Sequence, residues 1–338
     1  MPKNIVIFSD GTGQEGGEGN NTNVYKLFNM IVDRSPEQIG FYDRGLGTGW
    51  RKFTGSVAGA GMSRNIRECY QFLFENFCAG DQIYLFGFSR GAATVRSLSG
   101  FIHMFGILPK SRPELIKKAY RIYKSHRTNR EQRAKEFLSR HHTMWTRVKF
   151  LGVWDTVAAL GVPFRTMDVI LDWLPGFEHK FHNFELSECV EHARQALAID
   201  DERKTFHPLF WDQKIREYQT MKQVWFCGMH TDVGGGYAEA ALSDIALDWM
   251  VREAVQQGLL IYPRHEIKTK PDANGHMHDS RSGFPGSIFR KETRSWPTGR
   301  TDKPVIHTSV KERTKSRHNA DEPPYNPWIL ELDPEVES

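Results

Sequence analysis

The sequence contains few cysteines and no long apolar run. The first feature argues against a disulfide-rich protein, and the second argues against a protein with membrane-spanning helices. Only four cysteines occur among 338 residues, and no two of them form a CxxC pair. A disulfide framework and a cysteine-based zinc site are therefore not expected, and a reducing compartment is favoured. No run approaches the roughly 20 apolar residues of a membrane-spanning helix. The first residues reach Asp10 too soon for a signal peptide, so we expect a cytoplasmic protein, with delivery by a dedicated secretion system left open.

Three signatures of nucleotide and phosphate chemistry are also missing. The Gly-rich run 11–19 lacks the GK[ST] of a P-loop, and no dinucleotide-binding fingerprint occurs. The stretch around Asp10 fails the DxDGT motif of haloacid-dehalogenase phosphatases, because Phe8 stands where the nucleophilic aspartate belongs. We therefore expect no cofactor and no bound metal.

The residues that are present indicate a folded globular protein with an uneven charge distribution. Hydrophobic residues make up 39% of the chain and aromatic residues 12%, which is enough for a sizeable core. The formal net charge is +4, yet segment 110–149 alone holds 13 Lys and Arg against 3 Glu. This segment forms either a solvated helical face or a surface that contacts anionic membrane. We expect no nucleic-acid partner, and the sequence does not indicate an oligomeric state.

Short apolar runs alternate with segments of helical periodicity. The runs predict strands at 5–8, 39–42, 83–86, 148–154 and 224–227. Helices are expected at 24–32, 66–77, 92–98 and 241–257, as a pair within 113–140, and around 195–198. This alternation favours an α/β-hydrolase-like, doubly wound and mostly parallel sheet with helices on both faces.

We expect one domain that covers residues 1–338, with two insertions and an irregular end. Basic helices occupy about 110–145, and an unusually apolar stretch at 161–190 is expected to form a lid or an acyl-binding wall. From about residue 263 the chain is rich in Pro, Gly and His and shows little periodicity.

The strongest local signal for chemistry is the stretch Gly87-Phe88-Ser89-Arg90-Gly91. It fits the G-x-S-x-G pattern, and an apolar strand precedes it while a helix of small residues follows. A nucleophilic serine in such a turn is strained, and side chains at the two glycine positions would collide with the neighbouring strand and helix. The sequence therefore predicts that Ser89 is a nucleophile, with a structural turn as the alternative.

A nucleophilic serine needs a general base. In α/β hydrolases the triad residues follow the chain order serine, acid, histidine, and this order can be sought in the sequence. Asp155 ends the next strong strand and His230 follows a later one, so Ser89, Asp155 and His230 form the expected triad. The alternatives are that Asp155 caps a helix and that His230 is a packed histidine. Asp232 is the rival acid, although its place two residues from His230 favours a role in shaping the loop.

Two backbone amide groups are needed to bind the oxyanion that develops on the substrate. The N–H of Arg90 is the first candidate, and that of Gly11 or Thr12 is the second. Asp10 either supports this second loop or caps a turn.

Seven stretches of the chain resemble one known family. They are FSDGTGQ (8–14), NTNVYKL (21–27), YDRGLGTG (42–49), GFSRGAATVRSLSGFI (87–102), FLGVWDTVAALG (150–161), ALAIDDERKTFHPLFW (196–211) and WFCGMHTDVGGGY (225–237). A weaker tail adds IHTSVKER (306–313) and YNP (325–327). The chain thus resembles the formerly uncharacterised domain family that includes the catalytic domain of class-one type VI secretion phospholipase effectors. The resemblance implies an α/β-hydrolase core and a serine acyl hydrolase, with Ser89 as nucleophile and His230 as base.

These observations predict a serine hydrolase that cleaves acyl esters, with a lipid-like ester or phospholipid as substrate. One alternative is a metal-dependent phosphoesterase, in which Asp10, Asp43, Asp155, His230 and Asp232 supply hard ligands near strand ends. The other is a non-catalytic module that binds membrane or a partner through the basic segment.

Overall fold

The computed structural model of the chain describes residues 2–11, 17, 19–45, 55–125, 127–157, 185–263, 268–282, 289–316 and 324–338, with the side chains of 55–60 and 127–128 excepted. Within these ranges, eight parallel strands form one sheet in the order β2-β1-β3-β4-β5-β6-β7-β8. The strands are β1 (Asn4–Ser9), β2 (Gln38–Asp43), β3 (Gln82–Phe88), β4 (Val148–Trp154), β5 (Val190–Ala198), β6 (Thr220–Phe226), β7 (Val305–His307) and β8 (Glu335–Glu337).

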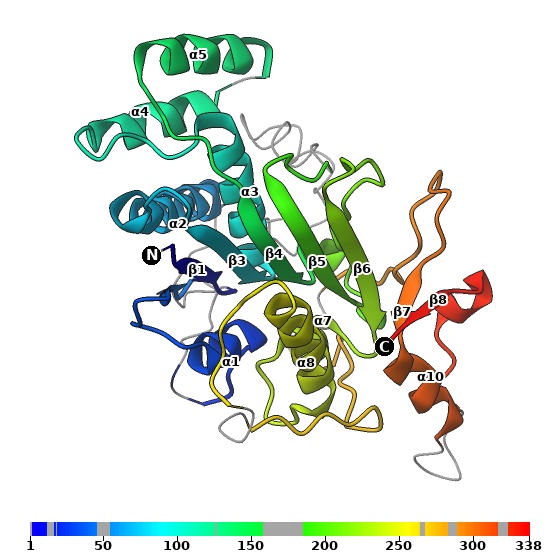
Figure 1. The fold of residues 1–338 in the computed structure, drawn as a ribbon. Coiled ribbons are helices and arrows are strands. Elements are labelled where there is room, and N and C mark those ends of the chain that lie inside the picture. The colour runs from blue at the N-terminus through cyan, green and yellow to red at the C-terminus, as the bar shows by residue number, and fades with distance from the viewer. Residues whose placement is uncertain are drawn as a thin grey trace.

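Helices cover both faces of the sheet (Figure 1). They are α1 (Asn23–Met30), α2 (Gly55–Asn76), α3 (Arg90–Phe105), α4 (Glu114–Tyr123), α5 (Arg127–Arg140), α7 (His230–Gly234), α8 (Ala241–Val255) and α10 (Thr308–Lys315), with short 3₁₀ turns at Lys204–Phe206 and Trp328–Leu332. The helices α2 to α5 pack on one face around one hydrophobic cluster, and α1 and α8 pack on the other around a second. The prediction of an α/β-hydrolase, doubly wound parallel sheet is confirmed.

Strands β1 and β3 are apolar along most of their length because helices bury them from both sides. The residues from Ile5 to Phe8 in β1 are fully buried, as are those from Leu85 to Phe86 in β3. A strand with two covered faces reads as a continuous apolar run rather than an alternating one. For this reason the sequence located these strands to within one or two residues of their ends.

The helix expected around residues 195–198 is wrong, because this stretch ends strand β5. Ala196 pairs with Trp154 on one side and with Val224 on the other. Gln, Ala and Leu are good helix formers, so local propensity favoured a helix. The central place between β4 and β6 overrides that weak preference, and the side chain of Gln195 is buried there with hydrogen bonds to Thr156 and Gln223.

Much of the expected lid or wall at 161–190 lies outside the described residues, which resume at Glu185. The C-terminal stretch beyond residue 263 adds β7, α10 and β8 to the fold. Strands β7 and β8 have three residues each, which is too short to produce a recognisable period, so periodicity could not predict them. Among the described residues, no helix has both the length and the apolar character needed to cross a membrane.

Candidate active site

Ser89 occupies the sharp turn between β3 and α3 at the carboxyl edge of the sheet. Its backbone has φ 57° and ψ −119°, in a region that residues other than glycine rarely adopt. A Cβ on Gly91 would lie 2.0 Å from the carbonyl oxygen of Ser9, and one on Gly87 would lie 2.6 Å from the backbone of Gly91. Both glycines of the predicted elbow are therefore required by the close approach of β1, β3 and α3.

The structure brings Asp155 and His230 together directly. Asp155 follows β4, and one of its carboxylate oxygens, Oδ2, lies 2.6 Å from Nδ1 of His230. His230 is the first residue of α7, and its ring packs against Phe88 with a centroid distance of 4.6 Å. Because Phe88 directly precedes Ser89, the imidazole lies beside the elbow. Gly234 makes this packing possible, since a Cβ there would lie 2.0 Å from the Phe88 ring.

The carboxylate of Asp155 has a second partner that the sequence did not reveal. The guanidinium of Arg294 donates to both carboxylate oxygens, at 2.7 and 2.8 Å, and both side chains are fully buried. Arg294 also donates to the carbonyl oxygens of Ala198 and Phe206. This bidentate pair fixes the orientation of the carboxylate that contacts His230.

Burial and charge act in opposite directions on this pair of groups. Burial would raise the pKa of Asp155, but the charge and hydrogen bonds of Arg294, helped by His230, outweigh it and hold that pKa below its ordinary value. Burial lowers the pKa of His230, and the hydrogen bond and charge of Asp155 offset only part of this effect. His230 is therefore neutral at neutral pH, as a proton acceptor must be.

The loop after β1 lies close to the elbow, but one of the two backbone N–H groups expected to bind the oxyanion makes a hydrogen bond within the loop. The N–H of Gly11 donates to the carboxylate of Asp10 at 2.7 Å, so it is not directed at a substrate oxyanion in this structure. Thr12 lies outside the described residues. Arg90 is the first residue of α3, where amide groups point out of the helix end.

Asp10 is buried beneath this loop and holds it together. Its other oxygen accepts hydrogen bonds from the hydroxyl groups of Thr22 and Tyr42, both at 2.6 Å. Burial raises the pKa of Asp10 to about 6, even though these hydrogen bonds act to lower it. The side chain thus ties together the ends of β1 and β2 and the start of α1, as expected of a supporting residue.

Asp232 contacts His278, whereas a triad acid would have to contact His230. Its carboxylate lies 2.6 Å from Nδ1 of His278 and accepts the backbone N–H groups of Met229 and His278. It therefore shapes the loop around α7 and does not contact the imidazole of His230. His278 belongs to the H-x-H at 276–278, so one histidine of that pair is held by a hydrogen bond to Asp232.

The carboxylates of the alternative metal site do not gather around one point. Asp43 accepts from the Ser9 hydroxyl, Asp10 from Thr22 and Tyr42, and Asp155 is held by Arg294. Within the described ranges, no group of three His, Cys, Asp or Glu side chains is placed to hold a metal ion. The geometry of these side chains gives the metal-dependent alternative no support.

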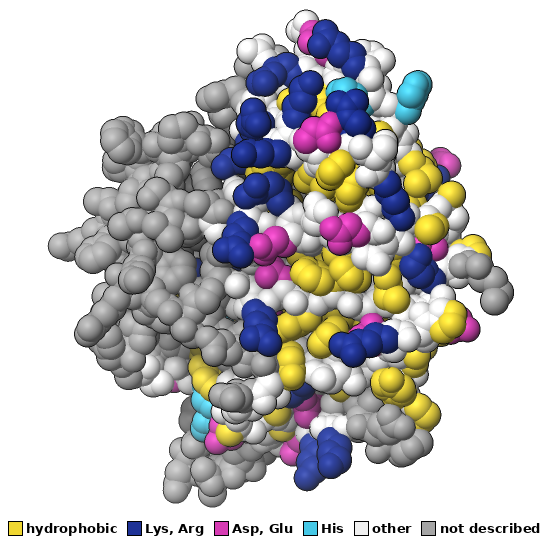
Figure 2. Space-filling model, turned by 90° about the vertical axis from the view of Figure 1, so that its left-hand side faces the viewer, with side chains coloured by type: hydrophobic (Ala, Val, Ile, Leu, Met, Phe, Trp, Pro, Cys, Tyr) yellow, Lys and Arg dark blue, Asp and Glu magenta, His cyan; other side chains and the backbone are white. Residues whose placement is uncertain are grey.

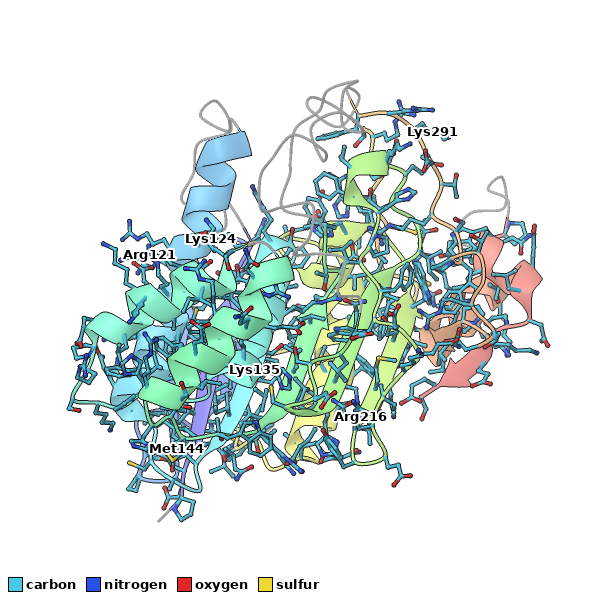
Figure 3. The ribbon with its side chains drawn as sticks, turned by 90° about the horizontal axis from the view of Figure 1, so that it is seen from above. Arg121, Lys124, Lys135, Met144, Arg216 and Lys291 are labelled. Carbon is cyan, nitrogen blue, oxygen red and sulfur yellow. The ribbon has the colours of Figure 1, made fainter. Side chains whose placement is uncertain are left out.

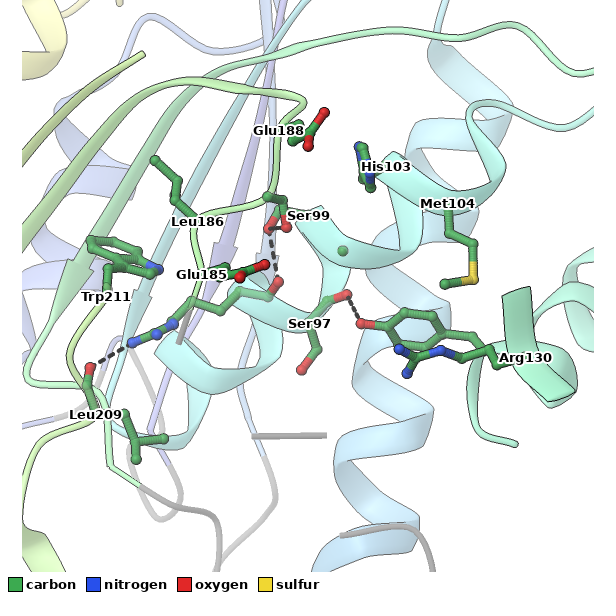
Figure 4. Close-up of a pocket in the computed structure, with 14 residues that line it drawn as sticks. Ser97, Ser99, His103, Met104, Arg130, Glu185, Leu186, Glu188, Leu209 and Trp211 are labelled. Atoms are coloured by element: carbon green, nitrogen blue, oxygen red, sulfur yellow. Dashed lines mark hydrogen bonds between the residues drawn. The ribbon is translucent and has the colours of Figure 1, made fainter. Parts of the chain in front are cut away.

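A cavity of about 190 Å³ lies along the flank of α3 (Figure 4). The guanidinium of Arg96 lies on its wall, donates to the carbonyl oxygens of Leu209 and Phe210, and stacks over Trp211. Burial lowers the pKa of Arg96 to about 9. Ser89, Asp155 and His230 are not among the described residues that line this cavity.

A parallel sheet with a strained serine elbow and a buried Asp–His pair at its carboxyl edge defines an α/β hydrolase. The chain belongs to the family of type VI secretion system Tle1-like phospholipase effector catalytic domains, whose model matches residues 3–253.

Among individual proteins, the chain is similar to the uncharacterized protein YEL023C of Saccharomyces cerevisiae. The two are 30% identical over 235 residues, which are 61% of this chain and 32% of that protein. The chain thus spans about a third of the length of this relative.

Three solved structures are also similar. An uncharacterized protein from Pseudomonas aeruginosa has a TM-score of 0.47 at 17% identity, over 81% of this chain and 50% of that one. The Tle1 effector bound to the VgrG spike has a TM-score of 0.39 at 20% identity, over 70% and 52%. The esterase Est2 of Thermogutta terrifontis has a TM-score of 0.41 at 12% identity, over 77% and 83%.

Proposed function

We propose that the protein is a serine hydrolase that cleaves carboxylic esters of lipid-like substrates, including phospholipids. The observation that supports this most strongly is the buried Asp155–His230 pair, 2.6 Å apart, beside the strained elbow of Ser89. A catalytic base held by a buried carboxylate next to a serine is the arrangement that acyl transfer requires. The family description supports a phospholipid as the substrate class.

In the proposed reaction, Oγ of Ser89 attacks the ester carbonyl carbon while Nε2 of His230 accepts the serine proton. Asp155 binds Nδ1, so Nε2 is the ring nitrogen available for this transfer. The tetrahedral intermediate collapses, the carbon–oxygen bond to the leaving alcohol breaks, and His230 returns the proton to that alcohol. Water then attacks the acyl-serine with His230 again as base, which releases the carboxylic acid and restores Ser89.

The developing oxyanion is proposed to bind the N–H of Arg90 and one amide group of the loop that follows Asp10. Because Gly11 donates to Asp10, Thr12 is the better candidate for the second donor. Each such donor stabilises the transition state by about 3 kcal/mol.

The proposal is tested by measuring hydrolysis of p-nitrophenyl esters of increasing chain length, followed by defined phospholipids. We expect Ser89→Ala to lower kcat by about 10⁴-fold or more, because the nucleophile is removed. Ser139→Ala, on the outer helix α5, is the matched control and keeps wild-type activity. Full activity of Ser89→Ala would refute the serine mechanism, and a steep preference for short soluble esters would refute the lipid-like substrate.

A further inference from the structure

The outer surface of α4 and α5 carries an excess of basic side chains (Figure 2). We call this surface the basic face. It comprises seven exposed side chains that make no ion pair with another described residue: Lys117, Lys118, Arg121, Lys124, Arg133, Lys135 and Arg140. At its borders the basic residues do have partners, since Arg112 binds Glu114 and Lys149 binds Glu191.

Helix α4 orients this charge outward because its opposite side is apolar. Leu115, Ile116 and Ala119 are buried against the layer formed by α2 and α3. Lys117 and Arg121 are four residues apart and therefore lie next to each other on the exposed side. Like charges at this spacing destabilise an isolated helix slightly, so this pair adds nothing to the stability of α4.

Three exposed apolar side chains lie on α5 or in the segment that follows it. The side chain of Trp145 is 59% exposed, and Leu138 and Met144 are 36% and 37% exposed. Trp145 and Met144 lie in the segment that joins α5 to β4. Tryptophan at the boundary between apolar and aqueous phases, flanked by Lys and Arg, is typical of surfaces that rest on a lipid headgroup layer.

The basic face also extends toward the edge of the sheet that carries Ser89. Ile107, which precedes α4, forms a β-bridge with Met144, which precedes β4. This bridge lies at the edge of the sheet where β4 begins, opposite the edge that carries Ser89. Arg121 and Lys124 lie at the other end of α4, away from Met144 (Figure 3). The basic residues at this end of α4 therefore lie nearer the edge with Ser89 than Met144 does.

We propose that the basic face docks the protein onto the surface of an anionic lipid bilayer. The charge complements anionic headgroups, and the exposed Leu138, Met144 and Trp145 insert among them. Aliphatic side chains such as Leu138 contribute nothing to phosphate-backbone binding, so a membrane is favoured over nucleic acid as the occupant. The proposal concerns binding and does not depend on the proposed hydrolase activity.

The test uses co-sedimentation with phosphatidylserine–phosphatidylcholine vesicles and with pure phosphatidylcholine vesicles. The protein carries Ser89→Ala in every sample, so that hydrolysis does not change the lipid. We expect binding to the anionic vesicles that weakens with added salt, and little binding to the neutral ones. Equal binding to both kinds of vesicle, or binding to neither, would overturn the proposal.

Charge reversal locates the docking surface. Lys117→Glu, Arg121→Glu and Lys124→Glu together should weaken binding on the order of a hundredfold, since each basic residue near an anionic surface contributes about fivefold. The matched control reverses three exposed lysines on other elements and changes the net charge equally: Lys214→Glu, Lys268→Glu and Lys311→Glu. Equal losses in both variants would refute a role for this face. Circular dichroism checks that both variants are folded.

Trp145 gives an independent spectroscopic readout that needs no charge reversal. Its emission should shift to shorter wavelength when anionic vesicles are added, and Trp145→Phe should abolish that shift. No difference between the two proteins would contradict insertion at this point. Binding of a single-stranded oligonucleotide under the same salt conditions, with no vesicle binding, would replace the membrane by nucleic acid as the partner.

Discussion

Arg294 is the residue on which the buried Asp155 depends. A carboxylate with no exposed surface is costly unless it is paired, and Arg294 supplies two hydrogen bonds and a full charge. Arg294 is thus a positioning residue, because it acts through Asp155 and not on the substrate.

Replacement of Arg294 by Gln should lower the free energy of unfolding by about 3–5 kcal/mol, because Asp155 is left buried without its partner. The folded-state pKa of Asp155 lies below its ordinary value of 3.8, so the stabilising effect is present above that pH and is lost as the pH falls through the folded-state pKa. Urea denaturation at pH 7 measures the full effect, and at pH 3 the difference between wild type and Arg294→Gln should already be smaller. Arg294→Lys should restore part of the stability at pH 7. Equal stability of wild type and Arg294→Gln at pH 7 would contradict this role.

His230 determines the acid limit of the proposed activity. Burial lowers its pKa below the ordinary value of 6.5, so the neutral, proton-accepting ring persists to lower pH than in a free histidine. We expect kcat/KM to be constant from pH 7 upward until other groups titrate, and to fall as the pH drops through a value below 6.5. A pH–rate profile with a soluble ester checks this, and an acid limb centred above 6.5 would contradict it.

The sequence predicted the contact between Asp155 and His230 but not Arg294. Asp155 and His230 each follow an apolar strand, and parallel strands bring their carboxyl ends to one edge. Arg294 follows no strand and no periodic segment, and it lies 139 residues from Asp155 in the chain. Nothing local distinguishes it from the other arginines, because its burial arises only when the C-terminal stretch folds over β5.

At the scale of elements, the crossing of β1, β3 and α3 sets the shape of the elbow. A Cβ on Gly91 would meet the carbonyl groups of Ser9 and Asp10 at 2.0 and 2.7 Å, and neither backbone can move without disturbing the sheet.

Gly91→Ala should therefore destabilise the protein by about 1–3 kcal/mol and displace Ser89, although alanine favours a helix. The matched control in the same helix is Gly100→Ala, whose Cβ would meet side-chain atoms of Tyr123 and Ser187 and no backbone atom, with the Tyr123 hydroxyl nearest at 2.8 Å. Thermal denaturation and ester hydrolysis compare the two. A larger loss in Gly100→Ala than in Gly91→Ala would show that the close approach is not the constraint.

Helices and strands were predictable where the pattern of burial and the local secondary-structure propensity favour the same element. They were not predictable where the two favour different elements. β1 and β3 are β-branched or aromatic along most of their length and fully covered, so pattern and structure coincide. β5 contains Ala196, Leu197 and Ala198, which favour a helix locally, and only its two neighbouring strands make it extended.

At the scale of the whole molecule, two distant parts of the chain complete one site. The N-terminal half provides Ser89 and Asp10, whereas the C-terminal stretch provides Arg294 and extends the sheet with β7 and β8. The basic face lies on a separate layer, over α4 and α5. If both proposals hold, one sheet carries the catalytic edge and supports the layer that binds lipid.

The convergence of Ser89, Asp155 and His230 is tested most directly by labelling with a fluorophosphonate probe, followed by mass spectrometry of the modified peptide. We predict one label, on Ser89. The rate of labelling should fall by about 10⁴-fold in Asp155→Asn, because Asp155 holds His230. It should stay near the wild-type rate in Asp232→Asn, because the carboxylate of Asp232 holds His278 instead. A label on another residue, or wild-type labelling of Asp155→Asn together with loss in Asp232→Asn, would contradict it.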